Sequence, residues 1–125
     1  MDSLDLDSIE QPRERWLSCG KVEFLVRYCS PREADTFRRR MIQDGVLRHT
    51  KDGVDVNPGR EGAYYKAFAE QYVIDWRGPI KPEGTVYSAD RMGRVLANRG
   101  DIKLAIEEAV TRAEAFFVSN GTGPT

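Results

Sequence analysis

Residues 63–79 read AYYKAFAEQYVIDWRGP, and they carry the clearest structural signal in the middle of the chain. Apolar residues recur there at intervals of three and four, which places them on one face of an α-helix. Gly78 and Pro79 predict where the helix ends, because glycine adopts the left-handed conformation that closes a helix and proline cannot continue it. We therefore expect a helix that buries Trp76, with a core face comprising Tyr65, Phe68, Ala69, Tyr72, Val73 and Trp76.

Asp75 lies near the predicted C-terminus of this helix, just before Trp76. Its negative charge opposes the helix macrodipole at that end, so we expect a compensating interaction with an N–H of residues 77–80 or with an arginine. Asp75, Trp76 and Gly78 are therefore predicted to form a structural turn.

Residues 15–28 form an extended segment in which apolar and polar side chains alternate along the second half. This pattern predicts an antiparallel β-hairpin that turns near Cys19 and Gly20. An isolated hairpin is only marginally stable in water, so we expect this one to pack against helices or to pair with an edge of another subunit.

Helix starts are marked at three further points. Ser30 and Glu33 have the spacing of a capping box, with a proline at the first helical position between them. Ser88 and Asp101 are predicted to cap two more helices, and the second of these carries a continuous apolar stripe that ends in a Phe-Phe pair. The three predicted helices cover residues 31–43, 88–98 and 101–117.

These elements predict an α+β fold that is mostly helical, with about four helices and a short N-terminal antiparallel β-hairpin. Residues 46–61 are expected to be a loop, with a short hairpin around Asp52 and Gly53 as the alternative. We expect a single globular domain over residues 13–118. An acidic N-terminal tail at residues 1–12, either solvated or docked on a partner, and a polar C-terminal tail at residues 119–125 flank it.

The composition excludes several classes of protein. The 125 residues have a net charge of −1 although 31% of them are charged, which argues against a nucleic-acid-binding protein. The sequence contains no apolar run long enough to cross a membrane and no export signal, so we expect a cytosolic protein. Cys19 and Cys29 fit neither a disulfide framework nor a zinc site, and we expect both to be reduced thiols.

The sequence also lacks a recognisable catalytic group of residues. His49 is the sole histidine, with no second histidine to share a metal and no nucleophile beside it. Glu107 and Glu108 are adjacent on a helix and therefore point in different directions, which makes them a poor acid–base pair. We expect no enzyme activity, no metal and no cofactor.

The order of these parts resembles the tail assembly chaperones of long-tailed bacteriophages. Shared features are an extended segment before a Ser-Pro-Arg-Glu helix start, a variable loop, a central helix that ends in Val-x-Asp-Trp-x-Gly, and a last helix that ends in Phe-Phe. The resemblance extends over residues 21–118. The matching residues are Val73, Asp75, Trp76 and Gly78, followed by Gly84, Ser88 and Phe116.

The resemblance implies a protein that acts in the host cytoplasm, binds the tape measure protein or other tail proteins, and assists assembly of the tail tube. The aromatic helix face and two arginines are the predicted partner-binding residues, namely Tyr65, Tyr72, Trp76, Arg38 and Arg39. Self-association stays open. One alternative is a structural protein of the phage tail or head–tail region, present in the virion, which uses its hairpin as a sheet edge. Another is a small regulatory or host-binding module that makes contact through the loop around His49 and the arginine run at residues 38–40.

Overall fold

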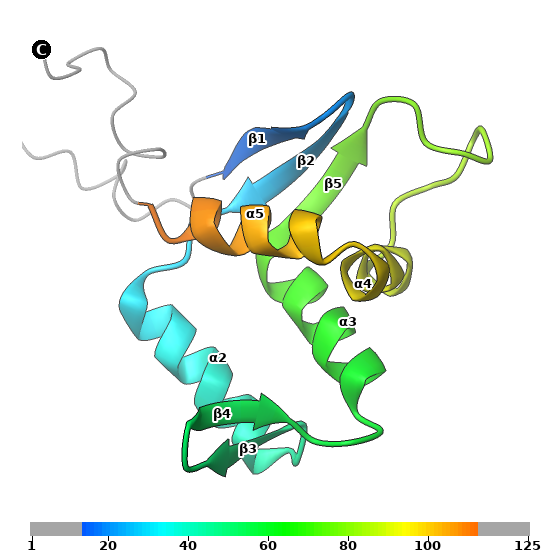
Figure 1. The fold of residues 1–125 in the computed structure, drawn as a ribbon. Coiled ribbons are helices and arrows are strands. Elements are labelled where there is room, and N and C mark those ends of the chain that lie inside the picture. Colours follow the sequence, from blue (N-terminus) through cyan, green and yellow to red (C-terminus); the bar gives the residue numbers. More distant parts are fainter. Residues whose placement is uncertain (1–13, 113–125) are drawn as a thin grey trace, which may run out of the picture.

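The computed structural model describes residues 14–112, and within them it has an α+β fold of four helices and two antiparallel sheets (Figure 1). The helix number and the N-terminal hairpin are as predicted, but the strand content is higher. The predicted tails at residues 1–12 and 119–125 lie outside the described residues, as do Phe116 and Phe117. The helices are α2 (Pro31–Gln43), α3 (Glu61–Tyr72), α4 (Ala89–Asn98) and α5 (Gly100–Val110).

The larger sheet joins segments that are far apart in sequence. Its three strands are β1 (Glu14–Cys19), β2 (Val22–Arg27) and β5 (Val73–Arg77), in the order β1-β2-β5. Both pairs are antiparallel, with Trp16 opposite Leu25 and Phe24 opposite Trp76. The alternation predicted for the second half of the hairpin is confirmed, because Phe24 and Val26 are buried.

The central helix is shorter than predicted. It ends at Tyr72, and the next five residues form β5, so the prediction that helix continues to Trp76 is wrong. The β-branched residues Val73 and Ile74 favour extended backbone, and β2 offers a hydrogen-bonding edge that residues 73–77 complete. This pairing is not local in sequence, which is why helical periodicity does not register it.

The helix start at Ser30 is confirmed in detail. Ser30 Oγ accepts a hydrogen bond from the backbone N–H of Glu33 at 3.1 Å, and Glu33 Oε1 accepts one from the N–H of Ser30 at 3.1 Å. Residues 46–61 contain a second hairpin, β3 (Leu47–Thr50) with β4 (Gly53–Val56), which is the alternative to a plain loop.

The starts of the last two helices differ in how well the sequence predicted them. Ser88 caps α4 as predicted, because its Oγ accepts from the N–H of Arg91 at 3.1 Å. Asp101 does not cap α5. The helix begins at Gly100 with Arg99 as its N-cap residue, and the Asp101 carboxylate instead accepts from Arg99 Nε at 2.9 Å and Nη2 at 2.8 Å.

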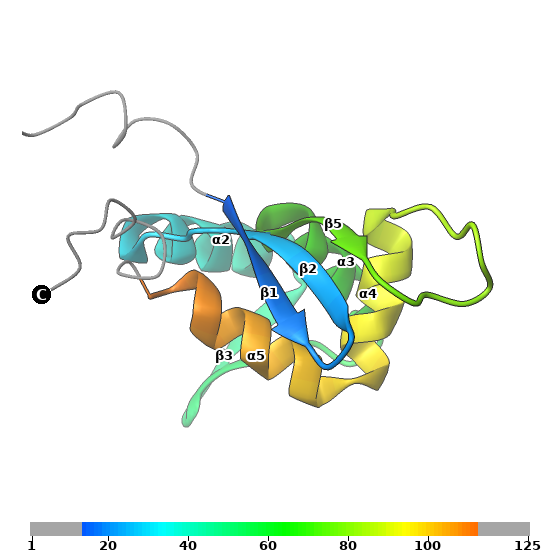
Figure 2. The ribbon, with the colours of Figure 1, turned by 90° about the horizontal axis from the view of Figure 1, so that it is seen from above.

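The core lies between the three-stranded sheet and the helices, with α5 and the end of α3 against the sheet (Figures 1 and 2). Its buried residues form one cluster that includes Phe24, Val26, Phe68, Met92, Leu96 and Ile106. Helices α3 and α4 cross closely at Gly93. A Cβ at this position would lie 3.2 Å from the Cα of Lys66, so the absence of a side chain permits the close approach. Within residues 14–112, no helix has the length and apolar character to cross a membrane.

Candidate functional site

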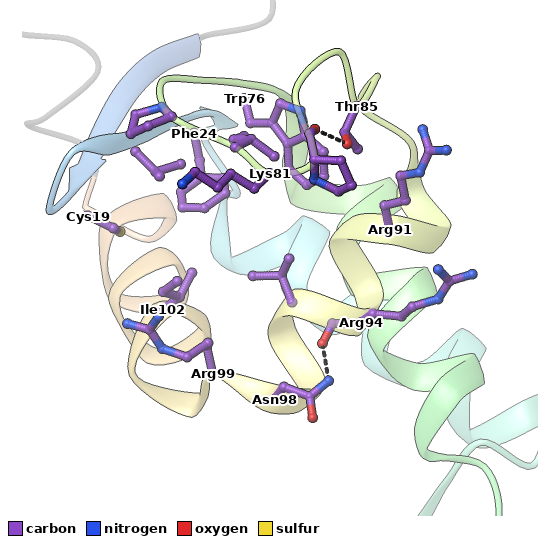
Figure 3. A pocket seen from close by; sticks show the side chains of 15 residues that line it. Cys19, Phe24, Trp76, Lys81, Thr85, Arg91, Arg94, Asn98, Arg99 and Ile102 are labelled. Carbon is purple, nitrogen blue, oxygen red and sulfur yellow. Dashed lines mark hydrogen bonds between the residues drawn. The ribbon is translucent and has the colours of Figure 1, made fainter.

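The main candidate site is an open hollow of about 710 Å³ beside the sheet, which we call the basic hollow (Figure 3). One wall is the loop of residues 78–88, which connects β5 to α4, and the others are the edge of the sheet, α4 and the first turn of α5. Apolar side chains from all of these elements form its floor, including Val22, Phe24, Trp76, Ile80, Val95 and Ile102.

Trp76 connects the sheet to this hollow. Its ring is partly buried: it packs against the core cluster and also lines the floor, so the predicted burial of Trp76 is only partial. The position follows from its place in β5, an edge strand of the sheet. The ring packs edge-on against Tyr87, with centroids 5.2 Å apart. Tyr87 in turn donates a hydrogen bond from its hydroxyl to the carbonyl of Val73 at 3.1 Å, and burial raises the pKa of Tyr87 to about 12.

Gly78 and Asp75 do not have the roles predicted for them at a helix end. Gly78 closes β5 with a φ of +115°, and a Cβ there would lie 2.6 Å from the carbonyl oxygen of Lys21 in the turn between β1 and β2. Asp75 is exposed, and its Oδ1 accepts from the N–H of Trp76 at 2.8 Å; among residues 14–112 it has no hydrogen bond to residues 77–80 and no ion pair with an arginine. Asp75 and Trp76 of the predicted turn therefore lie in strand β5, and Gly78 is the residue directly after the strand ends.

Four cations line the basic hollow, whose lining within the described residues contains neither Asp nor Glu. Arg99 is paired with Asp101, and the pKa of Asp101 is lowered to about 2 by hydrogen bonding to that guanidinium. Arg91 donates from Nη1 to the carbonyl of Val86 at 2.5 Å. Among residues 14–112, neither Lys81 nor Arg94 forms an ion pair.

The loop wall and α4 are braced by hydrogen bonds that lie beside these cations. Thr85 Oγ1 donates to the carbonyl of Pro82 at 2.5 Å, and Asn98 Nδ2 donates to the carbonyl of Arg94 at 2.7 Å (Figure 3). Both bonds tie a side chain to backbone three or four residues earlier. The Thr85 hydroxyl and the Asn98 amide therefore direct these hydrogen-bond donors to backbone carbonyls and not to water or a ligand.

A second hollow of about 440 Å³, which we call the aromatic groove, lies between α2, the β3–β4 hairpin, α3 and α5. Its charged lining residues are balanced, with Arg38 and Lys103 against Asp55 and Glu107. Lys103 Nζ lies 5.2 Å from the ring centroid of Phe68 and 3.5 Å from Glu107 Oε1. The aromatic side chains of the groove are Phe37, Tyr64, Tyr65, Phe68 and Tyr72.

The predicted partner-binding residues do not form one surface. Tyr65, Tyr72 and Arg38 line the aromatic groove, Trp76 lines the basic hollow, and Arg39 lines neither of them. Tyr72 is only 6% exposed, so it is mainly a core residue. Asp35 pairs with both arginines, at 2.9 Å from Arg38 and 2.5 Å from Arg39.

The cations of the basic hollow were missed at the sequence level. Arg91 and Arg94 are three residues apart in a helix predicted from its Ser88 cap, so their common face could have been recognised. Lys81 could not have been added to them, because its position depends on β5, where the sequence predicts helix.

Other reactive side chains do not gather into a site. Within residues 14–112, no three His, Cys, Asp or Glu residues are close enough to hold a metal ion, and His49 lies exposed on β3. Cys19 and Cys29 are free thiols, and burial raises the pKa of each, which makes the reactive thiolate less available.

Comparisons of the chain with protein-family models, with curated proteins and with solved structures found no match.

Proposed function

We propose that this chain is a tail assembly chaperone of a long-tailed bacteriophage, which acts in the host cytoplasm and binds segments of the tape measure protein without catalysis. The observation that carries the proposal is the basic hollow, which leaves part of an apolar floor open to solvent. Most residues of the resemblance lie between Val73 in β5 and the helix cap Ser88, a segment that includes the loop wall of the hollow and its lining residue Trp76.

The physical basis is the cost of leaving apolar surface in water. A partner helix that places its apolar face on the floor removes that surface from water at about 25 cal/mol per Å². The hollow lies in the range of about 300–1,000 Å³ that is typical of ligand pockets, so it accommodates several side chains of one helix face. Such binding would keep an apolar segment of a long tail protein soluble before assembly.

Co-expression with fragments of the tape measure protein tests this function. We expect the full chain to raise the solubility of at least one fragment and to co-purify with it. Ile80→Ser, which replaces an apolar side chain of the floor with a polar one, should reduce co-purification. Val86→Ser is the matched control, because Val86 lies in the same loop, is 70% exposed and does not line the hollow. Equal recovery with both variants, or no co-purification at all, would contradict the proposal.

A second candidate function is a structural role in the phage tail, and the sheet supplies a specific reason for it. Strands β1 and β5 are both edges of the three-stranded sheet in the described part of the chain. An edge strand can pair with a strand from a neighbouring subunit. Mass spectrometry of purified particles separates the two functions, because a structural protein is present in them at a fixed ratio to the tube protein and a chaperone is absent.

A further inference from the structure

The basic hollow differs in charge from the chain as a whole. The chain has a net charge of −1, yet the residues that line the hollow include four cations and, within the described residues, no carboxylate. Arg91 and Arg94 extend from α4 on one side, while Lys81 comes from the loop and Arg99 from the start of α5 (Figure 3). The charged ends of Arg91 and Arg94 point outward from α4, away from the apolar floor, so the positive charge lies around the rim of the hollow on more than one side (Figure 3).

We propose that the basic hollow binds an amphipathic helical segment of the tape measure protein that carries carboxylates beside its apolar face. This inference rests on the proposed function and names the chemistry of the partner. The apolar face would cover Trp76 and Ile102, and the carboxylates would meet the cations at the edge of the floor.

Two of the four cations are available for this role. Arg99 already forms a bidentate pair with Asp101, and Arg91 is held by the carbonyl of Val86. Lys81 and Arg94 have no ion-pair partner among residues 14–112 and stand on different walls of the hollow. They therefore provide two separate points of contact, which favour acidic side chains on the bound segment.

The same arrangement argues against a nucleic acid as the occupant. A phosphate backbone carries one charge per nucleotide and is bound by a series of cations along its path. Among residues 14–112, three lining cations, Lys81, Arg91 and Arg94, have no ion-pair partner, but they border apolar side chains, and burying charged phosphates against that floor would be costly. A segment with both apolar and acidic residues matches the floor and the edge together.

The experiment uses the full chain and three fluorescein-labelled helical peptides of equal length. The first has a leucine face flanked by glutamates, the second has lysines in place of the glutamates, and the third keeps the glutamates but has serines in place of the leucines. We expect fluorescence anisotropy to show the first peptide binding at least about tenfold more tightly than either of the others, with the preference weakening at high salt.

Charge-reversal variants locate the binding. Arg94→Glu and Lys81→Glu should each weaken binding of the glutamate peptide about tenfold and strengthen binding of the lysine peptide. Arg32→Glu is the matched control, since it makes the same change in net charge at an exposed residue of α2 that lines neither hollow. Circular dichroism spectra and melting temperatures confirm that each variant is folded.

Three results would overturn the inference: equal affinity for the glutamate and lysine peptides, an equal loss in Arg32→Glu and Arg94→Glu, or tighter binding to a labelled single-stranded DNA. This failure is distinguishable from failure of the proposed function. If tape measure fragments co-purify equally well with Arg94→Glu, the proposed chaperone function is retained and the proposal of an acidic partner segment is rejected. If the peptides bind in a charge-dependent way but no tape measure fragment co-purifies, the preference of the hollow for an acidic amphipathic helix is supported and the proposed chaperone function is rejected.

Discussion

The rings of Trp76 and Tyr87 meet edge to face, with planes inclined by 86° and centroids 5.2 Å apart. Tyr87 also binds the carbonyl of Val73 through its hydroxyl. These contacts join the strand before the 78–88 loop to the residues just before α4, so the loop is fastened at both ends. The shape of the basic hollow therefore depends on this aromatic pair as well as on the loop.

Trp76→Ala should lower the free energy of unfolding by about 2–3 kcal/mol. Complete burial of an aromatic ring would predict a loss of about 3–5 kcal/mol, and the partly buried position of Trp76 reduces it. Urea denaturation followed by far-ultraviolet circular dichroism measures the change. A loss below about 1 kcal/mol would show that the ring contributes little to packing.

Gly78→Ala should be more destabilising than an ordinary glycine substitution, by about 2–4 kcal/mol. The new methyl group would meet the backbone carbonyl of Lys21, and backbone cannot move aside as a side chain can. Gly84→Ala is the control. Gly84 also has a positive φ, of +80°, but a Cβ there has no neighbour within 4 Å, so only backbone strain of about 1 kcal/mol remains. Equal thermal shifts in the two variants would contradict the close approach at Gly78.

Ser30→Ala should cost about 1 kcal/mol, because it leaves an N–H of the first turn of α2 without its acceptor. Ser30→Asp supplies a carboxylate oxygen at the same position and should retain most of the stability. Thermal unfolding of both variants checks this. If the aspartate variant were as unstable as the alanine variant, hydrogen bonding at the cap would not be the cause.

Alkaline pH should destabilise the protein through Tyr72 and Tyr87. Burial raises the pKa of both phenols above the ordinary value of 10.0, for Tyr87 to about 12. The folded state therefore holds these protons more tightly than the unfolded state. The resulting stability is complete below pH 10 and is lost as the pH rises through the pKa values of the folded state. Tyr87→Phe should reduce the slope of unfolding free energy against pH between 10 and 12. An unchanged slope in Tyr87→Phe, measured by urea denaturation across that range, would be evidence against the shift.

Local signals predicted much of the fold. The capping box at Ser30, the cap at Ser88 and the alternation through Phe24 and Val26 each depend on residues within a few positions of one another, and all three are present in the structure. The β3–β4 hairpin was recognised as an alternative for the same reason.

The errors arise where distant residues decide the outcome. Residues 73–77 satisfy helical spacing, but they pair with β2, which lies about fifty residues earlier in the chain. Asp101 has the right residue type for a cap, but Arg99 binds its carboxylate. The basic hollow could not be predicted because it forms only when β5, the 78–88 loop and α4 are placed together.

The middle position of β2 has a consequence for how the chain is made. Strand β1, on one side of β2, is joined to it by a short turn, whereas β5, on the other side, begins only at Val73. A nascent chain on the ribosome therefore exposes one side of this apolar strand until Arg77 has emerged, and an unpaired strand can join the wrong neighbour. Truncated translation products that stop before β5 should consequently precipitate, whereas the completed polypeptide has the strand that protects this side.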